Sequence, residues 1–108
     1  MIEVEACRTL VKSPPELWSE FSDTALLGRL LGEQFGEIEI TRSRPEQLLV
    51  WRGAETGGTV HLSPSGWGTK VRLTVNVPDW APPAPAEAAL SSVLDEVGTA
   101  RHRPFSRN

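Results

Sequence analysis

Apolar and polar residues alternate along several stretches of the chain, and a period of two is typical of a strand with one buried face. The clearest example is residues 70–77, where aliphatic and polar residues strictly alternate. Similar alternation covers about residues 2–11, 36–41 and 59–63, and the short apolar run 48–51 reads as a further strand. Short turns expected at Ser43–Glu46, Thr56–Gly58 and Pro64–Gly66 join the later strands, and a parallel return would need a long crossover. We therefore predict an antiparallel sheet.

Between the first strand and the rest of the sheet, the apolar residues follow a helical period instead of a period of two. Ser13-Pro14-Pro15-Glu16 is a helix-start signal, because serine caps helices and proline and acids are favoured in the first turn. Apolar residues then recur with helical spacing, interrupted by Ser22-Asp23. Gly32 provides a stop signal. This pattern predicts two consecutive short helices.

The last third of the chain predicts one longer helix after a stiff connector. Residues 78–85 carry four prolines, which cannot continue a central strand or a helix interior. From Ala86 to Val97 the apolar residues follow spacings of three and one, and Gly98 provides a stop. We expect this helix to pack on the sheet.

The alternation also predicts which strand residues face inward. Leu48 and Val50 point away from that face, so the central strand is apolar on both sides. We expect its outer face to be covered, and a second subunit in a homodimer is one candidate. Since none of the inward residues can transfer a proton, the pattern favours binding over catalysis. The expected inward residues are Ile38, Ile40, Leu49, Trp51, Val60, Leu62, Val71, Leu73, Val75 and Val77.

Composition narrows the class of protein. The 108 residues suit a single domain, which we place at residues 1–100, followed by a flexible tail at 101–108. Hydrophobic residues make up 39%, enough to exclude a wholly disordered chain. A net charge of −3 argues against nucleic-acid binding. The short apolar runs predict neither membrane insertion nor a secretory signal, so we expect a cytoplasmic protein.

Few residues carry candidate chemistry. Cys7, His61 and His102 have no metal-ligand spacing, and we expect no metal, no cofactor and no catalytic residue. The acid pairs at 3/5 and 37/39 alternate with apolar residues, as on a solvated sheet face. Trp67 in a turn and Trp80 among prolines are harder to bury, and such tryptophans often mark an interface or the mouth of a pocket.

The order of elements and three segments resemble one known group, the START-like superfamily with its helix-grip fold. "SPPELWSEFSD" (13–23) looks like its first helix, "RPEQLLVWRG" (44–53) like its central strand, and "GGTVHLSPSGWGTKVRLTVNV" (57–77) like its final hairpin. The resemblance implies an α+β fold. A curved antiparallel sheet of five to six strands would carry two short helices after the first strand and a C-terminal amphipathic helix. Because family members usually have more strands, any groove here is expected to be small or open at one edge.

The resemblance also implies a function. Such a protein would bind or transport a small hydrophobic molecule, lipid or polyketide-like, in a groove between the sheet and the C-terminal helix. Two alternatives stay open: a polyketide cyclase- or dehydratase-like enzyme of the same fold, and a protein-interaction module with no ligand. The residues expected to line the groove are Leu49, Trp51, Leu62, Leu73, Val75, Leu90 and Leu94.

Overall fold

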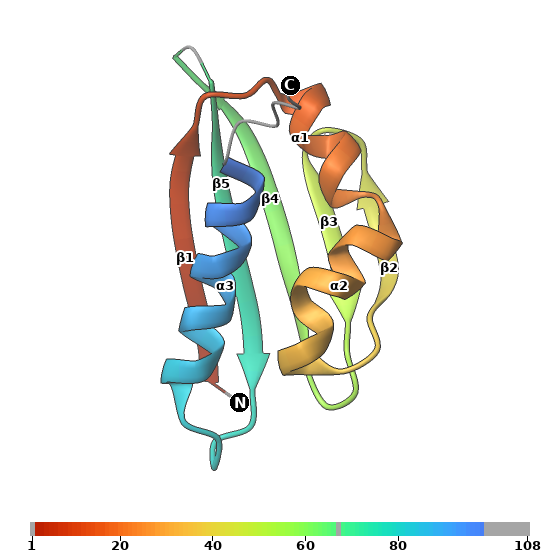
Figure 1. The fold of residues 1–108 in the computed structure, drawn as a ribbon, viewed down its shortest axis with the longest axis vertical. Coiled ribbons are helices and arrows are strands. Elements are labelled where there is room, and N and C mark those ends of the chain that lie inside the picture. Colours follow the sequence, from red (N-terminus) through yellow and green to blue (C-terminus); the bar gives the residue numbers. More distant parts are fainter. Residues whose placement is uncertain (1, 67, 99–108) are drawn as a thin grey trace, which may run out of the picture.

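The computed structural model describes residues 2–66 and 68–98 and contains five strands and three helices (Figure 1). The expected tail at 101–108 and Trp67 lie outside these residues. Along the chain the elements are β1 (Ile2–Leu10), α1 (Pro14–Phe21), α2 (Thr24–Phe35), β2 (Glu39–Arg44), β3 (Leu48–Arg52), β4 (Gly57–Ser65), β5 (Gly68–Val77) and α3 (Pro83–Gly98).

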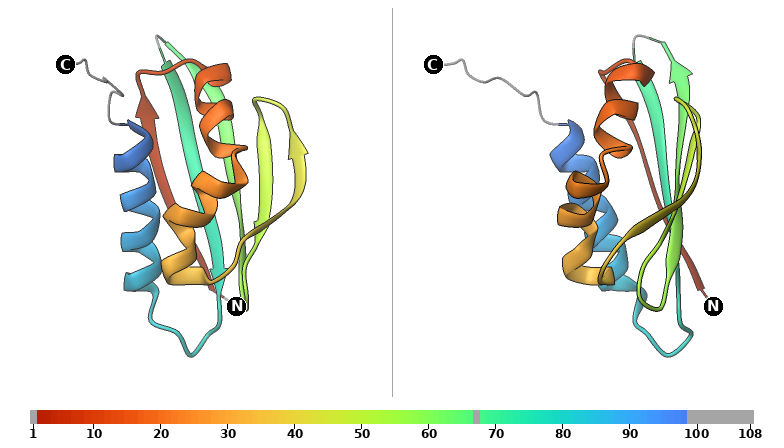
Figure 2. Two further views of the ribbon diagram at one scale, coloured as in Figure 1. Left: turned by 45° about the vertical axis from the view of Figure 1, so that its right-hand side comes forward. Right: turned by 90° about the vertical axis from the view of Figure 1, so that its right-hand side faces the viewer.

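The strands form one antiparallel sheet in the order β1-β5-β4-β3-β2. All three helices lie on one face of it (Figure 2). Helix α3 packs against β1 and β5, while α1 contacts β4 and α2 contacts β2. The predicted α+β class, the antiparallel sheet and the C-terminal helix on the sheet are confirmed.

Both short helices begin where the capping residues predicted. The Ser13 hydroxyl accepts a hydrogen bond from the Glu16 N–H at 3.4 Å, and prolines occupy the first turn of α1. The Asp23 carboxylate accepts hydrogen bonds from the N–H groups of Ala25 and Leu26 at 3.0 and 3.2 Å. These bonds satisfy helix-end donors that would otherwise lack a partner.

Two glycine signals were misread from the sequence. Helix α2 does not end at Gly32 but continues to Phe35, whose buried side chain packs in the core, and Gly36 with φ of 80° then ends it. The turn expected at Thr56–Gly58 falls at residues 53–56 instead, because Gly57 and Gly58 already pair with β5. Gly58 serves close packing rather than a turn, as shown below.

Two proline signals also differ from expectation. Strand β4 continues through Pro64 to Ser65. Its pairing with β3 stops at His61, opposite Leu48, the first residue of β3. A residue without an N–H is tolerated there because no strand lies on that side. Helix α3 begins at Pro83, inside the expected connector, since proline is compatible with the first helical turn.

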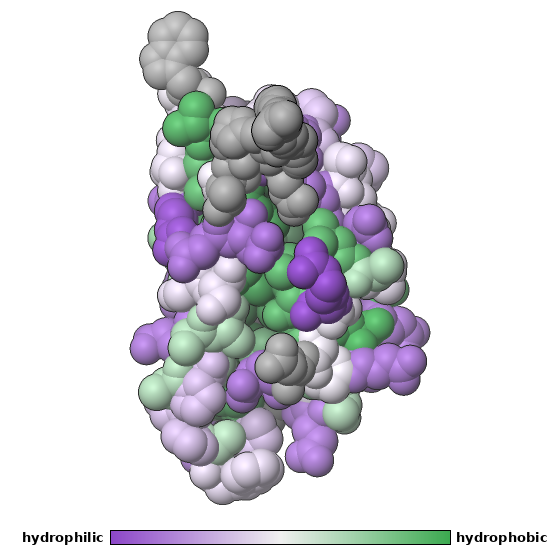
Figure 3. All heavy atoms as spheres, viewed as in Figure 1, coloured by the Kyte–Doolittle hydropathy of each residue, from purple (hydrophilic) through white to green (hydrophobic). Residues whose placement is uncertain are grey.

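The core lies between the sheet and the helices. Nine of the ten residues predicted to face inward are buried, and Ile40, in the edge strand, is half-buried. Figure 3 shows hydrophobic side chains gathered along the middle of the helical face, with hydrophilic ones on both sides. On the opposite face His61 is exposed, as predicted, while Leu48 and Val50 are half-buried. Within the described residues, no helix has the length and apolarity needed to cross a membrane.

The docking of α3 can be tested at Leu94, which is 1% exposed. Replacing Leu94 with alanine should lower the free energy of unfolding by about 2–5 kcal/mol, since transfer and cavity terms add. Urea unfolding followed by circular dichroism measures this loss. Val11→Ala, at a residue that is 89% exposed, is the control and should change little. A loss below about 0.5 kcal/mol for Leu94→Ala would mean that α3 is not docked.

A pair of glycines provides a second test. A Cβ added at Gly58 would collide with the Thr74 carbonyl oxygen and the Trp51 ring, whereas one at Gly28, inside α2, meets nothing within 4 Å. Gly58→Ala should therefore destabilise the protein, and Gly28→Ala should stabilise it by about 0.5–1 kcal/mol. Thermal unfolding compares the two variants. Equal effects would contradict the packing described for Gly58.

Candidate functional site

The structure brings all seven predicted groove residues together on the inner side of the sheet and under α3. Each is 5% exposed or less, and all belong to one core cluster. The seven residues are Leu49, Trp51, Leu62, Leu73, Val75, Leu90 and Leu94.

Trp51 packs between the sheet and α2. It pairs with Gly58 across β3 and β4, and a Cβ at Gly58 would lie only 2.6 Å from its Cζ2. The indole therefore lies on the glycine backbone. The Phe35 ring of α2 packs against it, with ring centroids 5.4 Å apart and planes tilted by 40°. Two aromatic side chains in tilted contact thus join the sheet and α2.

Next to this aromatic pair, a pocket of about 440 Å³ opens at the end of the sheet where β5 leaves and α3 begins. We call it the connector pocket. Four segments form its wall: the end of α2, the β3–β4 loop, the β5–α3 connector and the first turn of α3 (Figure 1). The lining residues are Gln34, Phe35, Gly36, Ala54, Glu55, Thr56, Val77, Pro78, Trp80, Ala81, Pro82, Pro85 and Ala86.

Backbone hydrogen bonds hold the β3–β4 loop against α2. The Ala54 N–H donates to the Phe35 carbonyl at 3.1 Å, and the Gly53 N–H closes the loop on the Thr56 carbonyl at 2.8 Å. The Thr56 hydroxyl donates to the Asn76 carbonyl in β5. Gly53 is needed for this approach, because a Cβ there would lie 2.6 Å from the Phe35 oxygen. One side of the connector pocket is therefore tied to both the helix and the sheet.

The connector forms the other side. The Ala81 N–H donates to the Pro78 carbonyl at 3.0 Å, which makes residues 78–81 a hydrogen-bonded turn. This turn carries Trp80 to the rim of the pocket, where its side chain is 78% exposed. The sequence had marked Trp80 as difficult to bury, and the structure confirms its exposure beside a pocket.

The floor of the connector pocket is apolar and its rim is mixed. Phe35, Val77 and Ala86 at the floor are all buried. Of the described lining residues only Glu55 is ionisable, and it is exposed. General acid–base chemistry needs a positioned proton donor or acceptor near the bound substrate, usually with a partner that tunes it. This lining suits binding better than proton transfer.

A polar depression of about 610 Å³ lies beside the connector pocket, between α2 and the start of β2. Its charged lining consists of Glu37, Glu39 and Arg52, all exposed. Both acids lie on the surface, as the alternation predicted. Among residues 2–66 and 68–98 the structure has no group of three or more side chains arranged to hold a metal ion.

The opposite end of the sheet is closed by a buried ion pair that the sequence analysis missed. Lys12 Nζ lies 3.0 Å from Glu20 Oε2, and the two side chains are 8% and 17% exposed. The Thr69 hydroxyl donates to the Lys12 carbonyl at 2.7 Å. Nothing local in the sequence marks these contacts, because Lys12 lies in a loop, Glu20 in α1 and Thr69 in the distant strand β5. It ties the β1–α1 link to β5.

Comparison with known proteins supports the fold. A scan against family profiles finds no match, and a search of curated proteins finds no similar sequence. Among solved structures, SSP2350 from Staphylococcus saprophyticus has a TM-score of 0.72 at 15% identity, over 90% of this chain and 89% of its own. DynU16, a protein of the dynemicin biosynthetic locus, has a TM-score of 0.71 at 16% identity, over 89% of this chain and 45% of its own.

A third structure is the Aha1 dimer from Colwellia psychrerythraea, with a TM-score of 0.64 at 14% identity, over 94% of this chain and 100% of its own. At such identities the likeness shows the fold alone. The chain has a small α+β, helix-grip-like fold.

The aromatic filling can be tested at Trp51, which is 2% exposed. Trp51→Ala should lower the free energy of unfolding by about 3–5 kcal/mol and leave an apolar cavity. Added indole should then raise the melting temperature of the variant more than that of the wild type, because dry apolar cavities bind small aromatic molecules. If Trp51→Ala is too unstable to study, Trp51→Leu serves instead. Equal indole effects on variant and wild type would contradict the packing.

Proposed function

We propose that this protein is a shortened member of the START-like superfamily and that it binds a small apolar molecule in the connector pocket without transforming it. The observation that carries the proposal is the pocket itself, with a buried apolar floor and an exposed tryptophan at its rim. Concave, mainly apolar pockets with a few polar groups are the usual form of small-molecule sites.

Membership of the superfamily is supported by three segments in the expected order, 13–23, 44–53 and 57–77, and by the helix-grip-like arrangement of sheet and helices. The five strands make this a reduced version of the fold. The space between sheet and helices is correspondingly small, and Trp51 and Phe35 occupy part of it.

The size of the pocket limits the ligand. A volume of about 440 Å³ lies near the lower end of the roughly 300–1,000 Å³ common for small-molecule sites. A compact ring system or a short acyl chain fits this volume. None of the seven residues predicted as groove lining lines this pocket, but Trp51 packs against Phe35 at its floor.

The cyclase-like alternative has less support, because Glu55 is the only ionisable residue among the described lining. The interaction-module alternative remains distinguishable by experiment. A homodimer across the half-buried Leu48 and Val50 is a separate prediction, and size-exclusion chromatography with light scattering would test it.

Binding can be measured with 1-naphthalenemethanol, a compact neutral aromatic probe, by isothermal titration calorimetry. We expect saturable binding at one site. Trp80→Ala should weaken it by about tenfold, since roughly 50 Å² of lost apolar contact corresponds to about that factor. Ala86→Leu, which fills the floor, should weaken it further.

Ala88→Leu is the matched control, because Ala88 lies on the same helix but is exposed and does not line the pocket. It should leave binding unchanged. Circular dichroism confirms that each variant is folded, and Trp80→Ala, at a solvent-exposed residue, is the variant least prone to unfold. Absence of saturable binding by the folded wild type would overturn the proposal and favour the interaction module.

A further inference from the structure

We propose that the connector pocket selects organic cations, namely molecules with an apolar body and an ammonium group, over neutral or anionic molecules of the same shape. This inference rests on the proposed function, since it requires that the pocket bind a small molecule. Three independent features of this end of the fold support it: an exposed indole, the charges of the surrounding loops and the orientation of two helices.

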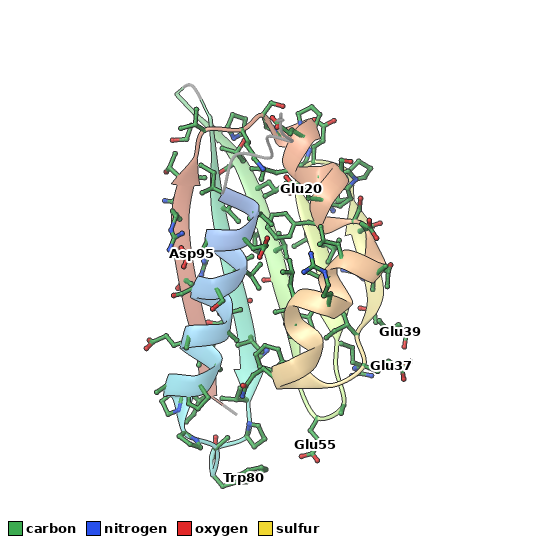
Figure 4. The ribbon with its side chains drawn as sticks, in the orientation of Figure 1. Glu20, Glu37, Glu39, Glu55, Trp80 and Asp95 are labelled. Carbon is green, nitrogen blue, oxygen red and sulfur yellow. The ribbon has the colours of Figure 1, made fainter. Side chains whose placement is uncertain are left out.

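The first feature is Trp80. Its side chain is 78% exposed although it lines an apolar pocket, so much of the indole surface is open to a ligand or to solvent. Tryptophan binds cations through the negative face of its ring more strongly than phenylalanine or tyrosine does. Figure 4 shows Trp80 and Glu55 at the same end of the molecule, projecting from the connector and from the β3–β4 loop. A cation at the rim would lie near both.

The second feature is the charge of the three loops that meet at the pocket, residues 36–38, 53–56 and 78–82. Of the three acids in these loops, only Glu55 lines the pocket; Glu37 lines the neighbouring polar depression, and Asp79 already takes part in another interaction. The nearest base is Arg52, the last residue of β3, which is the register partner of Glu39 and shares a shallow surface depression with Glu55. The one charge in the described lining is therefore negative, which attracts a cation and repels a carboxylate.

The third feature is the direction of the helices. Helix α2 ends at the pocket, so the negative end of its dipole points there, which favours positive charge. Helix α3 begins at the pocket, where a helix would normally offer N–H groups to an anion. Its first residues are Pro83, Ala84 and Pro85, and the two prolines have no N–H. Two of the four free N–H groups of this helix start are thus absent, which weakens its usual anion-binding feature.

The test uses three probes with one naphthalene ring: 1-naphthylmethylammonium, 1-naphthalenemethanol and 1-naphthoate. At neutral pH and roughly 0.02 M ionic strength, the ammonium should bind at least about threefold more tightly than the alcohol, and the carboxylate more weakly than either. At roughly 0.5 M salt the difference should shrink, because exposed charges are then screened.

Two variants assign the preference to residues. Glu55→Gln should weaken ammonium binding by about two- to fivefold and leave alcohol binding unchanged. Trp80→Leu keeps an apolar side chain but removes the ring face, so it should weaken ammonium binding more than alcohol binding. Glu46→Gln removes the same charge from the β2–β3 turn at the opposite end and is the matched control. It should change neither affinity.

The outcomes separate the two proposals. If no probe binds the folded wild type, the proposed function fails and this inference fails with it. If the alcohol binds and the ammonium binds equally or more weakly, the binding function stands and the cation preference is wrong. If the preference exists but Glu55→Gln and Trp80→Leu leave it intact, the assignment to this rim is wrong.

Discussion

The packing of one indole on one glycine determines how closely α2 approaches the sheet. Trp51 lies flat enough on β4 that Gly58 has no room for a side chain, and Phe35 rests on Trp51 from the helix side. A smaller residue at position 51 would leave a void, and a larger one at 58 would push the indole away. Phe35 also lies at the floor of the connector pocket. The Trp51–Phe35 contact therefore separates the packed core from this pocket.

Much of the fold could be predicted from local patterns. The period of two located four of the five strands, a short apolar run located β3, and the pattern placed residues as far apart as Ile38 and Val77 on the buried face. Capping residues gave the starts of both short helices. The glycines were harder, because a glycine that ends a helix and one that admits a neighbouring ring look alike in sequence. Gly32 lies inside α2 with open space beside it, and Gly58 admits the Trp51 ring, so neither has the stop or turn role that the sequence suggested.

The candidate site was only partly predictable, and the reason is geometric. Alternation shows which strand residues point inward, but it cannot show whether neighbouring side chains fill the space between them. The seven residues expected to line a groove are all buried in the core, and none of them lines the connector pocket. The connector pocket brings together Gln34, Glu55 and Trp80, which are far apart in the chain. They lie at the end of α2, in the β3–β4 loop and in the β5–α3 connector. Of these, Trp80 alone had a local signal, an aromatic residue placed among prolines.

The proline-rich connector has a consequence for how the pocket meets a ligand. Proline restricts its own φ and the conformation of the residue before it, even in the unfolded chain. Pro78, Pro82 and Pro85 all contribute to the wall, and a backbone hydrogen bond closes the turn between the first two. A wall built this way has little conformational entropy left to lose on binding. A preorganised surface of this kind can hold a compact ligand with more of the contact energy retained as affinity than a glycine-rich loop of equal length would allow.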